Sequence, residues 1–394
     1  MIKTHRANEQ GAVSLFVVIF AALLMTILTV SFIQLMLRDQ QQATTSDLSQ
    51  SAYDSAQAGV EDAKRLLILN QSCKSGAASS NVDCNKVYQA LTPPSGSNET
   101  NCDTLAAAGL VGETDGESKI QTNTGDLKLD QAYTCVKIAT DTDDYKGTLT
   151  AGQSTVVPIR GVSAFDTVEL SWFSREDLSN PNNVTAKLPA SRGGNIELPP
   201  VGSWDVDWPA LLRAQLIQTG ASFSLDQFDS SQADKSNTNT LFLYPNDVGT
   251  NTPDFGKDDI RRSPLNAPKL VRCDTNLSAN AYACTATIKL PASIDGQTGA
   301  NRNAYLHLGA LYNDSHFQIK LRQGSTPVRF DSVQPIVDST GRANDVFRRV
   351  QARVQLSSDY AYPDAAIDLQ GDLCKNFTIT NDNSGYSNSA TCTP

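Results

Sequence analysis

The residues of this chain best suited to covalent chemistry are its eight cysteines, because pairs of thiols can be oxidised to disulfides. All eight follow residue 70: Cys73, Cys84, Cys102, Cys135, Cys273, Cys284, Cys374 and Cys392. An even number of cysteines confined to one part of a chain predicts disulfide bonds and an oxidising compartment outside the cytoplasm.

The cysteine spacing suggests some of the pairs. Cys273 and Cys284 flank ten residues between strand-like segments, which predicts a bridge that closes a hairpin. Cys374 and Cys392 would close the C-terminal segment. The first four cysteines leave three connectivities open, of which pairing neighbours along the chain is the most local. Each closed loop would add about 2–4 kcal/mol of stability.

A metal site is suggested by one short motif in the N-terminal part of the chain. Asp47, Ser49 and Ser51 spell the D-x-S-x-S of an integrin-type metal site. That site requires a loop after a buried strand, whereas these residues lie in a helical pattern, where a spacing of two points side chains around the helix. We therefore predict no metal site here.

A second motif, "DTDDYKG" at residues 141–147, begins like a calcium-binding loop. Asp141 and Asp143 have the spacing of the first two ligands, but Tyr145 fills the fifth position and Gly152 the twelfth. Neither residue is the carboxylate that such a loop requires at its end. We interpret the segment as an acidic turn.

Aromatic and histidine residues give no clear binding site. Trp204 and Trp208 stand beside two carboxylates and could face a sugar, but large aromatic side chains are mostly core residues. His307 alternates with leucines in a strand-like segment, and His316 follows a turn-like "NDS". Neither histidine has metal ligands at a recognisable spacing.

Enzymatic and nucleic-acid functions have little support in the composition and motifs. The sequence contains no G-x-S-x-G, H-E-x-x-H, G-x-G-x-x-G or G-x-x-x-x-G-K-[ST]. A formal net charge of −10 and a pI of about 4.8 repel phosphate backbones. We predict no catalytic residue, no cofactor, no metal and no nucleic-acid partner.

The element that carries most information lies before the cysteines. Residues 12–37 contain no charge and no proline, and as a helix they would span about 39 Å, more than the ~30 Å hydrocarbon core of a bilayer. A secretory signal has a shorter apolar region followed by a cleavage site. Lys3 and Arg6 precede the run, which predicts a cytoplasmic N-terminus and an external remainder.

The helical pattern continues beyond the apolar run. Residues 38–70 contain no proline, and small or apolar residues recur at spacings of three or four: Leu48, Ala52, Ala56, Val60, Ala63 and Leu67. We predict one unbroken helix over residues 12–70, about 88 Å long, whose C-terminal half presents this stripe to a partner.

From residue 71 the chain is typical of β structure with long loops. Seven period-two segments begin at residues 133, 167, 239, 282, 304, 317 and 346. One short helix is predicted at residues 208–218, where Pro209 suits a first turn. The predicted fold is therefore α+β, with a long N-terminal helix and a mostly antiparallel β head at 71–394, which could divide into two subdomains near 155–180.

Together, these features resemble the prepilins of type IV pilus and type II secretion systems. The segment "QGAVSLFVVIFAALLMTILTVSF", followed by "YDSAQAGVEDAKRLL", is similar to the N-terminal region of PilX-like and GspK-like minor pilins. The resemblance covers residues 1–70 only.

The resemblance implies a processing site and a set of partners. A prepilin peptidase would remove the leader, residues 1–11, by cutting after Gly11, and the new N-terminal Ala12 would be N-methylated. Residues 12–37 would form the transmembrane part of the helix and 38–70 its amphipathic extension. The implied partners are other pilin subunits through the helix, the prepilin peptidase, the inner-membrane assembly platform, and a host or neighbouring cell surface. The implied location is the inner membrane, then a surface pilus.

Two departures from the commonest pilins refine this expectation. Major pilins have a glutamate as the fifth mature residue, where this chain has Phe16, and an unpaired carboxylate in lipid is costly. Their helix-breaking glycine and proline are replaced by Met25 and Ile33. We therefore expect an unbroken helix and a minor, tip-proximal role in priming assembly.

Two other hypotheses remain. The chain could be a signal-anchored surface binding protein, adhesin-like or lectin-like, that is never assembled into a filament, because any uncharged run of about 20 residues can anchor a protein. A surface enzyme would require a convergent acid, base or metal site that the sequence does not reveal.

Overall fold

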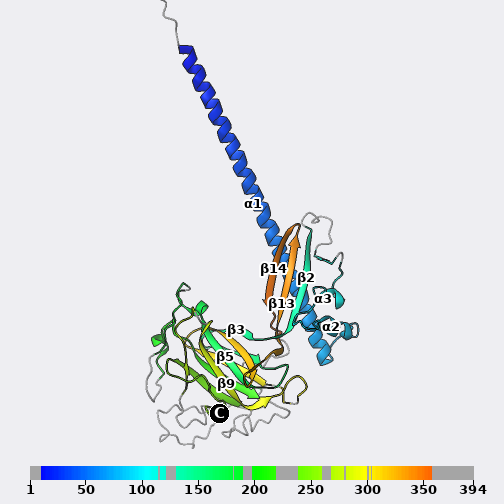
Figure 1. Ribbon diagram of the computed structural model, residues 1–394, viewed down its shortest axis with the longest axis vertical. Coiled ribbons are helices and arrows are strands. Elements are labelled where there is room, and N and C mark those ends of the chain that lie inside the picture. Colours follow the sequence, from blue (N-terminus) through cyan, green and yellow to red (C-terminus); the bar gives the residue numbers. More distant parts are fainter. Residues whose placement is uncertain are drawn as a thin grey trace, which may run out of the picture.

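The computed structural model describes residues 10–113, 116–120, 130–180, 182–189, 198–218, 238–259, 268–278, 281–299, 301–302 and 304–356. Within these residues one long helix projects from a β-rich head (Figure 1). The predicted α+β class with a mostly antiparallel head is confirmed, since only β7 and β8 pair in parallel among the described strands.

The helix α1 (Gln10–Ser75) is continuous over 66 residues. It ends five residues later than expected, where Gly76 adopts φ +72°, a conformation that glycine accepts without steric cost. The amide of Ala77 then donates to the carbonyl of Ser72 at 2.9 Å and closes the helix end. The prediction of an unbroken helix, which was based on the absence of a helix-breaking glycine and proline, is confirmed.

The C-terminal half of α1 packs on a four-stranded antiparallel sheet. Its order is β1 (Ser118–Lys119), β2 (Gln131–Thr142), β13 (Phe330–Ala343) and β14 (Val346–Arg353). Two short helices, α2 (Cys84–Ala90) and α3 (Thr104–Ala107), lie beside α1 and complete this core (Figure 1).

The rest of the head contains two further sheets that enclose the largest core. One has the order β4 (Ser154–Pro158), β10 (Ala304–Leu311), β6 (Leu211–Gln218), β7 (Thr238–Asn246) and β8 (Lys269–Arg272). The other has the order β12 (Thr326–Val328), β11 (Ser315–Gln323), β5 (Phe165–Ser174) and β9 (Tyr282–Ile294), with β3 (Tyr145–Leu149) also paired to β11. Short 3₁₀ turns occupy Arg175–Asp177 and Val201–Ser203.

The described residues of the head form two large hydrophobic cores and a smaller cluster around Trp204, and the boundary between the two large cores corrects the sequence prediction. The core under α1 includes Ile138 and Val337, whereas Tyr145 and Val333 belong to the core of the two larger sheets. The chain thus passes between the cores near residues 142–145 and returns along β13. The predicted boundary at 155–180 falls inside the second core, because one strand serves both and no linker marks the passage.

The predicted helix at 208–218 is wrong, because this segment contains the strand β6. Leu212, Ala214 and Leu216 are buried on one face of the strand, and Leu211 and Ile217 are buried on the other. A strand covered on both faces loses the alternation of apolar and polar residues, so its sequence imitates a helix. The seven segments with clear alternation all overlap strands, as predicted, although the segment that begins at residue 346 extends beyond β14, which ends at Arg353.

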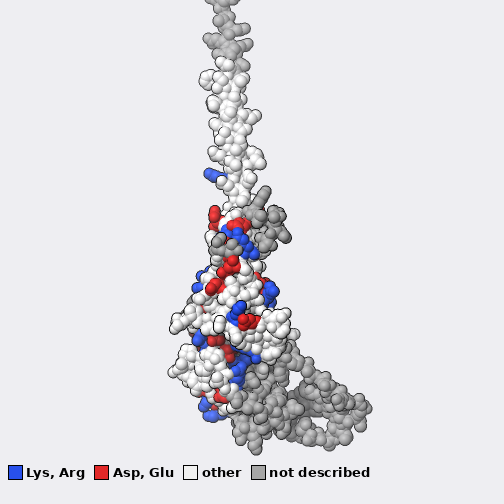
Figure 2. Space-filling model, turned by 90° about the vertical axis from the view of Figure 1, so that its right-hand side faces the viewer, with Lys and Arg blue, Asp and Glu red and all other residues white. Residues whose placement is uncertain are grey.

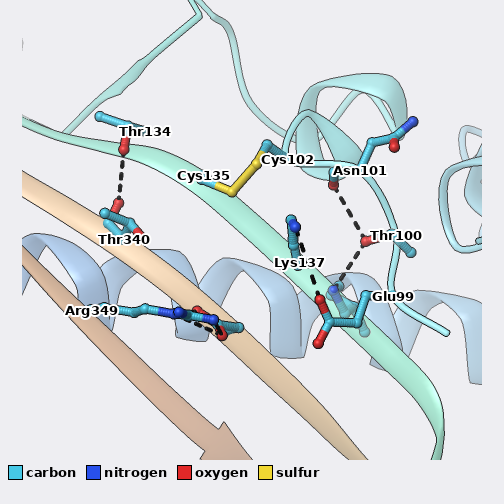
Figure 3. The surroundings of a disulfide bond; sticks show 11 residues. Glu99, Thr100, Asn101, Cys102, Thr134, Cys135, Lys137, Thr340 and Arg349 are labelled. Carbon is cyan, nitrogen blue, oxygen red and sulfur yellow. Dashed lines mark hydrogen bonds and ion pairs between the residues drawn. A yellow bond between two sulfur atoms is a disulfide. The ribbon is translucent and has the colours of Figure 1, made fainter. Parts of the chain in front are cut away.

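Three disulfides connect described residues. Cys73–Cys84 joins the end of α1 to α2, and Cys273–Cys284 joins the end of β8 to β9. Cys102–Cys135 joins the loop before α3 to β2 (Figure 3). These are the most local pairings among those that the sequence leaves open. Cys374 and Cys392 lie outside the described residues.

Candidate functional site

The N-terminal half of α1, which points away from the head, exposes a continuous apolar surface. Every large apolar side chain of residues 15–37 is 51–74% exposed, Phe16 most of all. Figure 2 shows most of the described part of the projecting helix without charged atoms, while charges of both signs lie on the visible face of the described head. By length and composition, α1 can cross a membrane.

The few hydroxyls in this segment are satisfied within the helix. Thr26 donates to the carbonyl of Leu23 at 2.8 Å, and Ser31 donates to the carbonyl of Ile27 at 2.8 Å. Thr29 bonds back to the preceding turn in the same way. Because no hydroxyl needs a partner outside the helix, the whole segment is suited to an apolar environment such as lipid or other helices.

The C-terminal half of α1 faces the protein's own sheet. This corrects the prediction that its stripe of small and apolar residues packs on an external partner. Ala52, Ala56 and Ala63 are fully buried, Leu67 is 1% exposed, and Val60 is partly buried. The small-residue stripe therefore packs on β2, β13 and β14 of the same chain. Sequence periodicity shows that a face is buried but not which surface buries it.

A glycine in the sheet permits the close approach of α1. A Cβ atom on Gly341 of β13 would lie 2.2 Å from the backbone nitrogen of Ala56 and 2.3 Å from the carbonyl oxygen of Ala52. No side chain fits at this point. A second close approach occurs at Gly59, whose Cβ would lie 2.4 Å from Ser339 Oγ.

The two glycines at the helix–sheet junction were missed by the sequence reasoning. Gly59 is the only glycine of the helical stretch after the apolar run, and Gly341 interrupts a strand pattern. An isolated glycine in a strand is a signal for the close approach of another backbone.

Polar contacts also join α1 to the sheet. Tyr133 donates its hydroxyl to Asp62 Oδ2 at 2.9 Å, and Arg348 Nε donates to Ser49 Oγ at 2.8 Å. Burial, together with the hydrogen bond to Asp62, raises the pKa of Tyr133, so the phenol stays protonated. These contacts fix how the helix is rotated on the sheet.

The first of the two metal-like motifs lies on a helix, as its spacing predicted. Asp47, Ser49 and Ser51 lie along α1, where Ser49 accepts from an arginine of the sheet. Among the described residues, no group of three or more His, Cys, Asp or Glu residues is arranged to hold a metal ion.

The acidic segment 141–147 forms the connection between β2 and β3. Its Tyr145 is a buried core residue. Asp141 stands opposite Asp331 on β13, and its pKa is raised by burial and then by that second carboxylate. Burial also acts to raise the pKa of Asp144, but hydrogen bonds from Arg353 and Gln318 lower it overall. The segment therefore contains two carboxylates with opposite pKa shifts.

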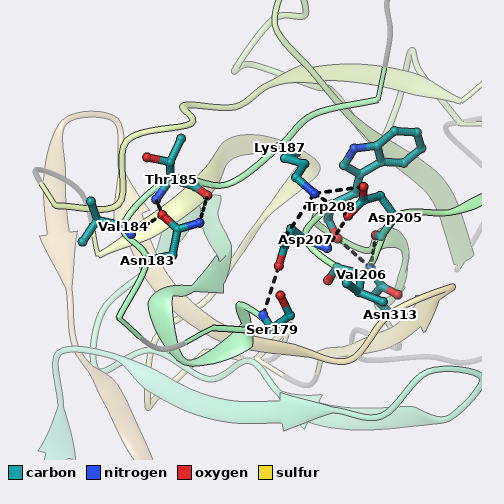
Figure 4. A network of polar contacts seen from close by, with 10 residues as sticks. All are labelled: Ser179, Asn183, Val184, Thr185, Lys187, Asp205, Val206, Asp207, Trp208 and Asn313. Atoms are coloured by element: carbon teal, nitrogen blue, oxygen red, sulfur yellow. Dashed lines mark hydrogen bonds and ion pairs between the residues drawn. The ribbon is translucent and has the colours of Figure 1, made fainter.

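The tryptophans pack together, in agreement with their prediction as core residues. Trp204 is 6% exposed and stacks on Tyr312 with ring centroids 4.3 Å apart, and Trp208 meets Trp204 edge-on at 5.2 Å. Asn313 donates to the carbonyl of Trp208 at 2.8 Å (Figure 4).

The two carboxylates between the tryptophans bind a lysine of the protein itself. Lys187 Nζ lies 3.1 Å from Asp205 Oδ2 and 3.3 Å from Asp207 Oδ2, as Figure 4 shows. The amide of Ser179 donates to Asp207 and is the main cause of the lowered pKa of this carboxyl. These acids stabilise the local loops and are not arranged to accept a sugar.

The two histidines of the head lie on strands. His307 is in β10, with Nδ1 3.3 Å from Gln215 Oε1. His316 is the second residue of β11 and not part of a turn, and its Nδ1 lies 2.6 Å from Asp177 Oδ1. The buried Asp177 also accepts from the backbone amide of His316, so the pair fixes the start of this strand.

No protein-family model, no curated protein and no solved structure matches the chain.

Proposed function

We propose that the protein is a minor pilin-like subunit of a type IV pilus or a related filament, with a structural and not a catalytic role. In this proposal a prepilin peptidase cuts after Gly11, α1 holds the subunit in the inner membrane, and the subunit then enters the filament near its tip. The assembly platform and other pilin subunits would be its partners. The head could then meet a host or neighbouring cell.

One observation carries the proposal: α1 is a single helix whose two halves have different surroundings. Residues 15–37 expose large apolar side chains, whereas Ala52, Ala56 and Ala63 are buried by the head. A helix that is free of its own head over this length can leave lipid only if another apolar surface replaces it. Packing among sister helices would supply that surface, since apolar burial stabilises by roughly 25 cal/mol per Å².

The second candidate is a signal-anchored surface protein that stays in the membrane. It is favoured by the burial of the small-residue stripe under the protein's own sheet, which leaves residues 15–37 as the apolar surface of α1 for other helices. Both candidates place α1 in a membrane. They differ in the fate of residues 1–11, which are removed in the pilin proposal and kept by a permanent anchor.

Mass spectrometry of the mature N-terminus separates the two candidates. The full chain is produced in cells with and without a prepilin peptidase, and we expect the peptidase to convert it to a form that begins at an N-methylated Ala12. A Gly11→Val variant should keep Met1 in both strains. Retention of Met1 by the unaltered chain beside an active peptidase would contradict the pilin proposal and favour the anchor.

A further inference from the structure

A cavity of about 770 Å³ lies on the face of β5, β9 and β11 that is turned away from the core. Strand alternation creates its floor, because Val168 and Leu170 of β5 point into the core while Glu169 and Ser171 between them point outward. Gln318 of β11 continues the floor, and Figure 1 shows β3, β5 and β9 in this part of the head. The floor therefore lies on three strands that are paired with one another.

The walls of the cavity come from the other sheet. Residues after β7 and at the end of β8, among them Asn251 and Arg272, face the floor from one side. The disulfide Cys273–Cys284 ties this wall to β9, and the amide of Thr287 donates to the carbonyl of Asn251 at 2.7 Å. A covalent bond and a backbone hydrogen bond thus hold the groove open before any ligand arrives, which lowers the entropic cost of binding.

The floor offers hydrogen-bonding groups in fixed positions. The hydroxyls of Ser171 and Thr285 lie 2.9 Å apart and share one hydrogen bond. The carboxylate of Glu169 accepts from Arg322 Nε at 2.7 Å and lies 3.8 Å from Lys320 Nζ. The carboxylate in the floor is therefore compensated by neighbouring cations, while its remaining lone pairs and the hydroxyls can still accept and donate.

The charges and the polarity of the lining argue against anionic and apolar ligands. Three carboxylates line the cavity, those of Glu169, Asp247 and Asp274, against the two cations Arg272 and Lys320. An anionic chain would meet more like charges than opposite ones, and an apolar ligand would leave the polar floor without partners. A neutral ligand with many hydroxyls satisfies donors and acceptors together. Tyr282 adds one partly buried aromatic ring at the edge.

We propose that this groove binds a neutral oligosaccharide, with Tyr282 packed on the C–H face of one sugar ring and the floor bonded to its hydroxyls. The cavity volume lies within the range of about 300–1,000 Å³ that is usual for small-ligand sites. The proposal concerns the head alone and holds whether or not α1 is processed or assembled. It gives the head a binding activity that the helix does not imply.

The test is binding of the full chain to an array of immobilised neutral oligosaccharides. The protein is kept in a detergent whose headgroup is not a sugar, because a maltoside or glucoside would compete for the groove. Sulfated and sialylated glycans and basic peptides form separate arms of the array. We expect binding to at least one neutral oligosaccharide and none to the anionic glycans.

Variants locate the binding in the groove. Tyr282→Ala should weaken it by about tenfold, near the upper limit for one aromatic contact, and Thr285→Val should weaken it less by removing one hydroxyl at constant shape. Tyr88→Ala, which removes an exposed tyrosine of α2, is the matched control and should bind like the unaltered chain. An unchanged melting temperature shows that each variant is folded.

Three outcomes would overturn the proposal. The first is the absence of binding to every neutral oligosaccharide, and the second is binding only to basic peptides or anionic glycans. The third is equal weakening by Tyr282→Ala and Tyr88→Ala in folded protein. None of these outcomes bears on the mature N-terminus, so this proposal and that of the pilin-like subunit fail independently.

Discussion

The two halves of α1 have different surroundings although they form one helix: one half is exposed and the other is buried by the head. Residues 15–37 carry large apolar side chains, all of them at least half exposed, while the buried face between Ala52 and Ala63 consists of small residues. Large side chains suit a surface that must be covered by lipid or by other helices. Small ones let a backbone approach a sheet closely, as at Gly341. Residue size therefore separates the half that needs an external partner from the half that does not.

The largest effect is expected where a charge enters the exposed half. Leu24→Arg places a cation near the centre of the apolar segment and should reduce membrane insertion by about 2.5–3.5 kcal/mol. The head should keep its stability, because Leu24 touches none of its core. The measurement is the fraction of full chain that resists alkaline extraction from membranes.

The control for this variant adds the same charge to the other half. Gln57 lies on the exposed face of the C-terminal half of α1, and Gln57→Arg should leave the chain in the membrane fraction. Equal extraction of both variants would show that the two halves do not differ in the way described.

A smaller effect is expected from one methyl group at the helix–sheet contact. Gly341→Ala places a Cβ within 2.2 Å of the α1 backbone and should destabilise the head by about 1–3 kcal/mol, measured by chemical denaturation. Membrane insertion should not change, which is the reverse of the result for Leu24→Arg.

Gly309→Ala is the matched control for overpacking. Gly309 also lies on a strand, but its added Cβ would find its nearest neighbour at 3.6 Å, an ordinary contact. If both alanine variants unfold at the same denaturant concentration, the close packing of α1 on β13 is not what holds the two elements together.

The smallest effect concerns the connection between β2 and β3, where the direction of each carboxyl's pKa shift decides the sign of the effect on stability. Burial, followed by Asp331, raises the pKa of Asp141 above its usual 3.8, although Arg329 and Lys74 of α1 oppose this. The folded state then binds the proton more tightly than the unfolded state, so stability falls as the pH rises from 3.8 through the raised value. Asp141→Asn should be more stable than the unaltered chain at neutral pH, and the difference should vanish below pH 3.8.

Asp144→Asn should give the opposite result in the same connection between β2 and β3. The pKa of Asp144 is lowered, so its ionised form stabilises the fold above pH 3.8, and this contribution is lost as the pH falls through the lowered value. The variant should be less stable than the unaltered chain at neutral pH. Thermal unfolding between pH 3 and pH 7 measures both differences, and a common sign for the two variants would contradict the assigned shifts.

Much of the fold could be predicted because its pattern is local. The unbroken helix followed from spacing and from the absence of proline, and strands with one buried face followed from alternation, as in β11. The prediction failed for β6, where Leu211 and Leu212 are both buried because the strand is covered on both faces. The turn-like residues before His316 do connect two strands, β10 and β11, although the second strand already begins at Ser315.

The candidate sites show the same limit. The sequence identified the apolar segment and the buried stripe at Ala52, Ala56 and Ala63, but it assigned that stripe to a partner. The polar groove was not foreseen, since Ser171, Tyr282 and Gln318 belong to three strands with no common motif. Only strand pairing brings them together.

The sequence by itself determined the long helix, its apolar half and most of the strand-forming segments, because each depends on residues close together in the chain. The tertiary structure decided which surface covers the small-residue stripe, where one core ends and the next begins, and which polar side chains meet in the groove. Those features depend on contacts such as Ala56 with Gly341, hundreds of residues apart, and local periodicity carries no information about so distant a neighbour.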